Sequence, residues 1–164
     1  WFPEAMRTLA AMGAEVIIAP TMTNTIDRDV EISIARANSA VNQCYFLAVN
    51  VAGEQGNGRS VYYAPGGELI HECGAGREIS LIDVDFSRVR RNRETGWNGL
   101  GQVLKSFRDS AIEFPLHADI SVRKESMETL GPLQVPTKPK STRLNADETD
   151  RSNVTPYPPV IVAK

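Results

Sequence analysis

The stretch EVIIAPTMTNTIDRDVEISIARANSAVNQCYFLAV, residues 15–49, decides the fold of this chain. It opens with a short apolar run over residues 15–19, which Pro20 closes, and it ends with a second apolar run over residues 45–49. The residues between the runs, 28–42, place apolar side chains at helical spacing, namely Val30, Ile34, Ala37 and Val41. Because strands that are apolar throughout are typical of a parallel sheet covered on both faces, the stretch predicts an α/β arrangement in layers.

Three further helices are predicted on either side of this stretch. Residues 3–12 predict a helix, because Pro3 suits the first helical position and Gly13 supplies a stop signal. Asp85 is a plausible cap for a short helix that ends at Arg93. A last helix is expected over residues 101–114, where apolar residues again recur at helical spacing.

The segment between these helices predicts strands instead. Residues 60–64 and 68–73 flank the turn signal Pro65-Gly66-Gly67, and residues 77–84 alternate apolar and polar side chains. We therefore expect an antiparallel meander of three strands after the α/β part.

Composition and charge exclude several classes of protein. The content of 41% hydrophobic and 23% charged residues is that of a globular chain, and no apolar run approaches the roughly 20 residues of a membrane span. A net charge of -2 gives no reason to expect nucleic acid or a membrane surface as a partner. Two cysteines are too few for a disulfide framework, so we expect free thiols and a cytoplasmic location.

The last third of the chain differs in composition. Six of the ten prolines lie between Pro132 and Pro159, among Thr, Lys, Asp and Asn, and no helical or strand period persists there. Residues 116–164 therefore predict an extended tail that is partly disordered or packed on a partner subunit.

A series of short motifs follows in a fixed order along residues 1–90. They are Phe2-Pro3-Glu4 with Arg7, Gly13-Ala14-Glu15-Val16-Ile17, Pro20-Thr21, Arg36-Ala37 with Asn42, Val49-Asn50 with Gly53, Gly58 with Ser60, Pro65 with Gly67, and Asp83 with Arg88. In order and spacing they resemble the segment that follows the catalytic cysteine in the nitrilase superfamily of carbon–nitrogen hydrolases. One residue departs from that pattern: Arg59 stands where many members carry His before the serine.

The resemblance implies both a fold and a reaction. Residues 1–115 would form the C-terminal part of a nitrilase-like αββα sandwich that pairs into a homodimer. Members of the superfamily hydrolyse small amides, carbamoyl compounds or nitriles without a metal or an organic cofactor. They use a Glu–Lys–Cys triad, in which Glu is the general base, Cys attacks the substrate carbon to form a thioester, and Lys stabilises the intermediate.

The same resemblance places the whole triad upstream of Trp1. Residue 1 is not Met, and the first methionine, Met6, lies within the first predicted helix, so we expect further residues before Trp1 in the natural protein. Without the triad, this chain alone is expected to be inactive. The alternative is a non-catalytic, truncated relative that serves as an association module, and the sequence upstream of Trp1 distinguishes the two.

The resemblance also implies roles for individual residues. Trp1, Phe2, Thr21 and Met22 would line the substrate pocket, although core packing is the alternative for the two aromatic residues. Glu4 and Arg7 stand at i and i+3 on the first predicted helix. They would form a buried ion pair that supports the turn of the nucleophile, the alternative being an ordinary pair on a helix surface.

Other residues with catalytic chemistry receive structural interpretations. His71 and Cys73 lie on the same face of a predicted strand, but no acidic residue is identifiable by spacing to orient the histidine. We therefore expect Cys73, like Cys44, to be a buried structural cysteine. Residues 53–58 lack the Gly-Lys-Ser/Thr ending of a phosphate loop, and the arginines at 88–93 predict a solvated or subunit-facing helix.

Overall fold

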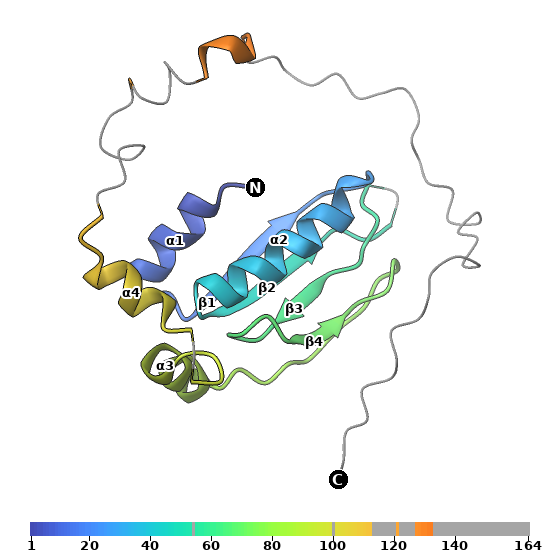
Figure 1. Ribbon diagram of the computed structural model, residues 1–164. Coiled ribbons are helices and arrows are strands. Elements are labelled where there is room, and N and C mark those ends of the chain that lie inside the picture. The colour runs from blue at the N-terminus through green and yellow to red at the C-terminus, as the bar shows by residue number, and fades with distance from the viewer. Residues whose placement is uncertain (54, 100, 113–120, 122–126, 133–164) are drawn as a thin grey trace.

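A four-stranded sheet in the order β1-β2-β3-β4 forms the centre of the computed structural model (Figure 1), which describes residues 1–53, 55–99, 101–112, 121 and 127–132. Strand β1 (Val16–Thr21) pairs parallel to β2 (Tyr45–Asn50). Strands β3 (Val61–Tyr63) and β4 (Leu69–Glu72) continue the sheet in antiparallel pairing. The predicted parallel pair and the hairpin that follows it are confirmed.

The first helices agree closely with the sequence prediction. Helix α1 (Pro3–Ala11) begins at its proline, and Gly13 beyond its end adopts φ +103°, a conformation that favours glycine. Helix α2 (Asp27–Val41) spans the predicted range. Helix α3 (Phe86–Thr95) begins after Asp85, whose carboxylate accepts a hydrogen bond of 2.8 Å from the backbone N–H of Ser87.

The later helices are shorter. Helix α4 (Val103–Asp109) ends five residues before the predicted end at residue 114, which lies outside the described residues. A short 3₁₀ turn, η1 (Glu128–Leu130), lies in the predicted tail, most of which also lies outside the described residues, so the boundary near residue 115 stays a prediction. No helix in the described ranges is both long and apolar enough to cross a membrane.

Helices α1 and α2 pack on one face of the sheet (Figure 1). Because side chains alternate along a strand, Ile17, Phe46 and Val61 all point to this face. The core on this side consists of Ile17, Ala35, Cys44, Phe46, Ala48, Val61 and Tyr63.

The other face of the sheet is covered only at one end in the described part of the chain. There Val89 of α3 packs with Tyr45 and Ala64. Farther along the same face, Ile18 is 63% exposed and Val49 is also exposed. The expectation of a sheet covered on both faces is therefore wrong for the described residues, although the apolar side chains that such a cover needs are present.

Pro20 lies inside β1 and does not close it, because the strand continues to Thr21. Proline removes one backbone donor from a ladder, and this is tolerated where a strand pairs on one side only. Among the described residues β1 pairs with β2 alone, so the missing donor costs no ladder hydrogen bond.

The inward face of α2 differs from the one that helical spacing suggested. Val30 and Val41 of the predicted apolar face are exposed, while the buried residues of the helix are Arg28, Ala35, Asn38 and Ser39. Helical spacing identifies which residues share a face, but it does not say which face points inward. The polar face is turned inward because its side chains find hydrogen-bond partners beneath the helix.

The third strand of the predicted meander does not form. Residues 77–84 have no strand pairing, and Ile79 and Leu81 are almost fully exposed. This segment crosses over the half-covered face of the sheet instead of lying beside β4, since Ser80 Oγ donates a hydrogen bond of 2.9 Å to the hydroxyl of Tyr62. Alternation of side chains satisfied the strand pattern, but a strand also needs a neighbour for its backbone groups.

Candidate functional site

A buried arginine lies beneath the carboxyl ends of β1 and β2. Arg28, in the first turn of α2, is 1% exposed, and its guanidinium donates hydrogen bonds to the carbonyl oxygens of Arg59 (2.7 Å) and Ala48 (3.3 Å). It also forms an ion pair of 3.0 Å with Glu31, one turn along the helix. Buried charges are stable only when they are paired and hydrogen-bonded, and this one links α2, β2 and the loop before β3.

Asn50, the last residue of β2, is the second centre of the site. Its side-chain oxygen accepts hydrogen bonds from Thr21 Oγ1 (3.1 Å) and the backbone N–H of Thr23 (2.8 Å). Its side-chain nitrogen donates to the carbonyl oxygens of Thr23 and Gly58 and to Asn57 Oδ1, each at 2.9 Å. One amide side chain thus ties together the segments that leave β1 and β2 at the same edge of the sheet.

Two further side chains complete this polar network. Thr23 Oγ1 donates a hydrogen bond of 2.8 Å to Glu31, which connects the loop after β1 to the ion pair of Arg28. Ser60 Oγ accepts a hydrogen bond of 3.0 Å from the backbone N–H of Asn50. The carboxyl ends of parallel strands are where α/β proteins often bind ligands, and here the backbone at that edge is held rigidly from below.

The sequence analysis quoted Asn50 and Ser60 only as motif residues and missed Arg28 and Glu31. The available signal was weak: Arg28, Glu31, Ala35 and Asn38 recur at spacings of three and four, the pattern of one helix face. Such a polar face is normally exposed to solvent. Only the partners supplied by β2 and the loop before β3 make it an interior face.

A hollow of about 580 Å³ adjoins the network on the half-covered face of the sheet. Its lining residues include Val49, Asn50, Ser60, Tyr62, Cys73 and Glu78. An apolar wall with a few convergent polar groups is the usual form of a small-molecule site.

The four residues predicted to line a substrate pocket lie at the same end of the molecule. Figure 1 shows the N-terminus near the carboxyl end of β1, where Thr21 and Met22 lie. Thr21 belongs to the polar network, whereas Trp1, Phe2 and Met22 are largely exposed. Among the described residues no hydrogen bond joins either aromatic side chain to Thr21, so contact with a substrate stays a prediction.

The ion pair predicted between Glu4 and Arg7 is absent from the structure, in which both residues are described. Glu4 is exposed, and Arg7 lies with its guanidinium 5.4 Å from the ring centre of Phe107 on α4. Nη1 of Arg7 is buried without a hydrogen-bond partner, and burial lowers the pKa of the side chain. The cation–π contact takes the place of the ion pair, while the supporting role of the two residues stays a prediction.

Cys44 has the environment of a structural cysteine. Its side chain is fully buried in the main core, and burial raises the pKa of the thiol from its ordinary value of 9.0 to about 11. A nucleophilic cysteine needs a thiolate at neutral pH, which this environment opposes. The structural interpretation of Cys44 agrees with both observations.

The raised pKa predicts a specific pH dependence of stability. Because the folded state disfavours the thiolate, Cys44 contributes fully below about pH 9, and the contribution is lost as the pH rises towards about 11. The difference in unfolding free energy between the native chain and Cys44→Ala is therefore expected to be constant below about pH 9 and to shrink above it. Urea unfolding at a series of pH values measures this difference, and one that does not change up to about pH 11 would contradict the prediction.

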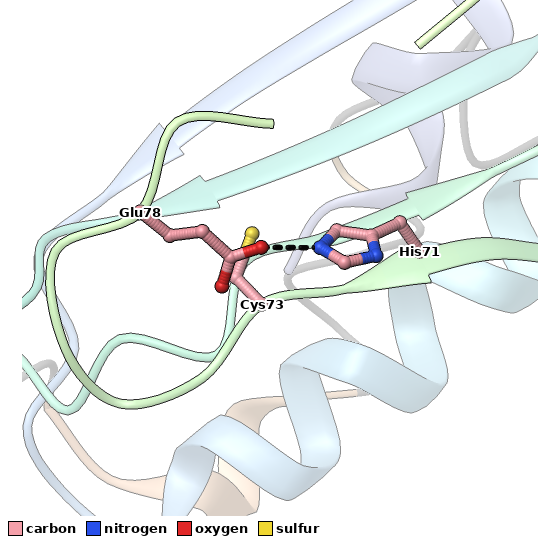
Figure 2. Close-up of side chains that lie close together, drawn as sticks. All are labelled: His71, Cys73 and Glu78. Atoms are coloured by element: carbon pink, nitrogen blue, oxygen red, sulfur yellow. Dashed lines mark hydrogen bonds and ion pairs between the residues drawn. The ribbon is translucent and has the colours of Figure 1, made fainter. Parts of the chain in front are cut away.

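The structure supplies an acidic partner for His71 that spacing did not reveal. Figure 2 shows the imidazole of His71 facing the carboxylate of Glu78, with Nε2 to Oε1 at 2.5 Å and the sulfur of Cys73 beside this contact. The sulfur approaches the hydroxyls of Ser80 (3.6 Å) and Tyr62 (3.7 Å), and no hydrogen bond joins it to the histidine in the described structure. Because Nε2 faces the carboxylate, the arrangement is not that of a histidine withdrawing a proton from the thiol.

Comparison of the sequence with known proteins gives a consistent result. The carbon–nitrogen hydrolase family matches residues 1–94. N-carbamoylputrescine amidase of Solanum tuberosum is 28% identical, in an alignment that covers 59% of this chain and 39% of that enzyme. The human deaminated glutathione amidase is also 28% identical, covering 56% of this chain and 30% of that enzyme. This chain thus spans well under half the length of these relatives.

Solved structures show the same relationship in three dimensions. A carbon–nitrogen hydrolase from Helicobacter pylori G27 aligns with a TM-score of 0.56 and 23% identity, covering 72% of this chain and 45% of that one. A Saccharomyces cerevisiae member of branch 10 of the nitrilase superfamily aligns with a TM-score of 0.53 and 27% identity, covering 57% and 36%. These likenesses confirm the predicted fold.

Proposed function

This chain belongs to the carbon–nitrogen hydrolase family, and from that relationship we propose that it is the part of such an enzyme that follows the catalytic cysteine. The observation that carries the proposal is the family match over residues 1–94, which begins at the first residue of the chain. The substrate would be a small amide, a carbamoyl compound or a nitrile. Relatives named for N-carbamoylputrescine and deaminated glutathione support the first two classes.

In the proposed reaction a cysteine thiolate attacks the substrate carbon, and a glutamate moves the protons. A lysine stabilises the charge of the tetrahedral intermediate, ammonia or an amine leaves, and water hydrolyses the thioester. All three groups are predicted to precede Trp1, so this chain would contribute none of them and would be inactive alone.

What the chain would contribute is a rigid wall of the substrate pocket. The network around Arg28 and Asn50 holds the ends of β1 and β2 in place, and Thr21 and Met22 stand at that edge. A catalytic geometry must be held closely, because small displacements of reacting groups cost large factors in rate. The half-covered face of the sheet would pack against the remainder of the domain. The homodimer and the cytoplasmic location stay predictions.

The proposal is tested with the full-length protein, expressed from the reading frame that contains this chain. Ammonia release is measured with a small aliphatic amide, an N-carbamoyl amine and a nitrile. We expect turnover of at least one class, loss of turnover when the cysteine predicted before Trp1 is replaced by alanine, and no turnover by the 164-residue chain alone. A folded full-length protein that hydrolyses none of them would favour the alternative, a non-catalytic association module.

The pocket role of Met22 predicts a change in substrate use. In the full-length enzyme, Met22→Ala is expected to lower kcat/KM about tenfold, mainly through KM, because truncating an apolar pocket residue removes about 1–3 kcal/mol of binding. Met12→Ala is the matched control, since Met12 is also exposed but follows the far end of α1. Equal kinetic effects of the two substitutions would contradict the assignment of Met22 to the pocket.

A further inference from the structure

We propose that His71, Cys73 and Glu78 form a binding site for a zinc ion. An imidazole nitrogen, a thiol sulfur and a carboxylate oxygen from these side chains all lie within 4.8 Å of one another (Figure 2). Zinc binds these three donor types in proteins, in a tetrahedral arrangement with bonds of about 2.0–2.3 Å. The site does not depend on the hydrolase activity, because none of the three residues belongs to the predicted catalytic triad.

Two features of the backbone bring the three side chains together. His71 is in β4 and Cys73 follows the strand directly, so their spacing of two places both on one side of the chain. The loop after Cys73 contains Gly74 and Gly76 and returns over the sheet, where Glu78 meets the histidine. The backbone N–H of Gly74 donates a hydrogen bond of 3.0 Å to Glu78 Oε2, which orients the carboxylate towards the cluster.

The spacing of the donors suits an ion after small side-chain movements. Bonds of the stated length place neighbouring ligands of a tetrahedral zinc ion about 3.5 Å apart. The donor atoms are already within 4.8 Å, and the hydrogen bond between His71 and Glu78 would give way to two bonds to the metal. Side-chain rotation is sufficient for this, since His71 and Glu78 are only partly buried.

The chemical state of the ligands also favours metal binding. Metal-binding carboxylates must be ionised, and the pKa of Glu78 is lowered by the hydrogen bond from Gly74 and by the contact with His71. Cys73 is 8% exposed and faces the hollow from its inner side, while Glu78 lines the hollow as well. An ion would enter from the hollow, and its fourth ligand would be a water molecule.

Zinc bound here would tie the loop at 74–80 to β4. Without an ion this loop is held by side-chain contacts alone, mainly those of Glu78 and Ser80. A bound ion would add bonds to three positions in eight residues and would stabilise the chain by an amount that grows with the zinc concentration.

The test is zinc binding to the purified chain, measured by competition with a chromophoric chelator. Cobalt(II) is the second probe, because a cobalt–thiolate bond gives a charge-transfer absorption that reports Cys73 directly. We expect one ion per chain, and a loss of affinity in His71→Ala, Cys73→Ser and Glu78→Gln that exceeds the about tenfold typical of removing an outer partner. The cobalt–thiolate band should disappear in Cys73→Ser.

The chain offers a matched control for each ligand. It contains two histidines and two cysteines, so His117→Ala and Cys44→Ala remove the same chemical groups elsewhere. Glu72→Gln is the carboxylate control, since Glu72 pairs with Arg59. The controls should retain zinc affinity, and circular dichroism should show that all variants are folded. Absence of zinc binding by the folded chain, or binding that survives both His71→Ala and Glu78→Gln, would overturn the proposal.

Discussion

Replacing Arg28 with methionine is expected to destabilise the folded chain by about 3–5 kcal/mol, the cost typical of breaking a buried ion pair by removing one partner. Methionine fills much of the same volume but provides no donor. The substitution would leave Glu31 without its cation and would remove the donor to the carbonyl oxygens of Ala48 and Arg59. Buried acceptors that lose their partners cost about 1–3 kcal/mol each.

The matched control for this prediction is Arg90→Met. Arg90 also forms an ion pair, at 2.9 Å to Glu15, but its side chain is 71% exposed. Surface pairs of this kind contribute about 0–1 kcal/mol, so we expect little change in stability. Urea unfolding of both variants measures the contrast. Equal, small losses in the two variants would show that the Arg28 network does not stabilise the fold.

Replacing Asn50 with aspartate is expected to have the second large effect, a loss of about 3 kcal/mol or more at neutral pH. The two side chains have nearly the same shape, but aspartate exchanges the donor nitrogen for an oxygen. That oxygen would face the carbonyl oxygens of Thr23 and Gly58 and the side-chain oxygen of Asn57, all of which now accept from the nitrogen. Acceptor would meet acceptor, and the charge would be partly buried.

The pH dependence identifies the cause of this loss. Because the surroundings disfavour the ionised form, the pKa of the new carboxyl would rise above the value of about 3.9 that it has in the unfolded chain. The deficit should therefore be smallest near about pH 4 and grow as the pH rises. Asn24→Asp, in the exposed loop after β1, is the control and should show no such trend. A deficit independent of pH would contradict the proposed cause.

The helices and parallel strands were predictable because their signals are local. Pro3, the apolar run at 15–19 and the cap at Asp85 act through the residues next to them, and the corresponding elements form at the expected places. The third predicted strand failed because strand formation is not local. Residues 77–84 have the alternation of a strand, yet in the described structure they cross the sheet face instead of pairing along its edge.

The candidate site was predictable only in outline. The motifs placed Thr21 and Asn50 near the carboxyl ends of β1 and β2, and the structure joins the two by a hydrogen bond. Arg28 was missed because a charged residue in a first helical turn is usually exposed. Glu78 was not recognised as the partner of His71 because the loop between them brings the two together without any regular spacing.

The sequence by itself determined the family, the order of the main helices and strands and the parallel start of the sheet, because short motifs and periodic apolar residues encode these features locally. Tertiary structure alone decided which face of α2 points inward, that Arg28 is buried, and that His71, Cys73 and Glu78 meet. The physical reason is that burying a charge or gathering donor atoms depends on partners from distant segments. Their positions follow from the packing of the whole sheet and not from any local pattern.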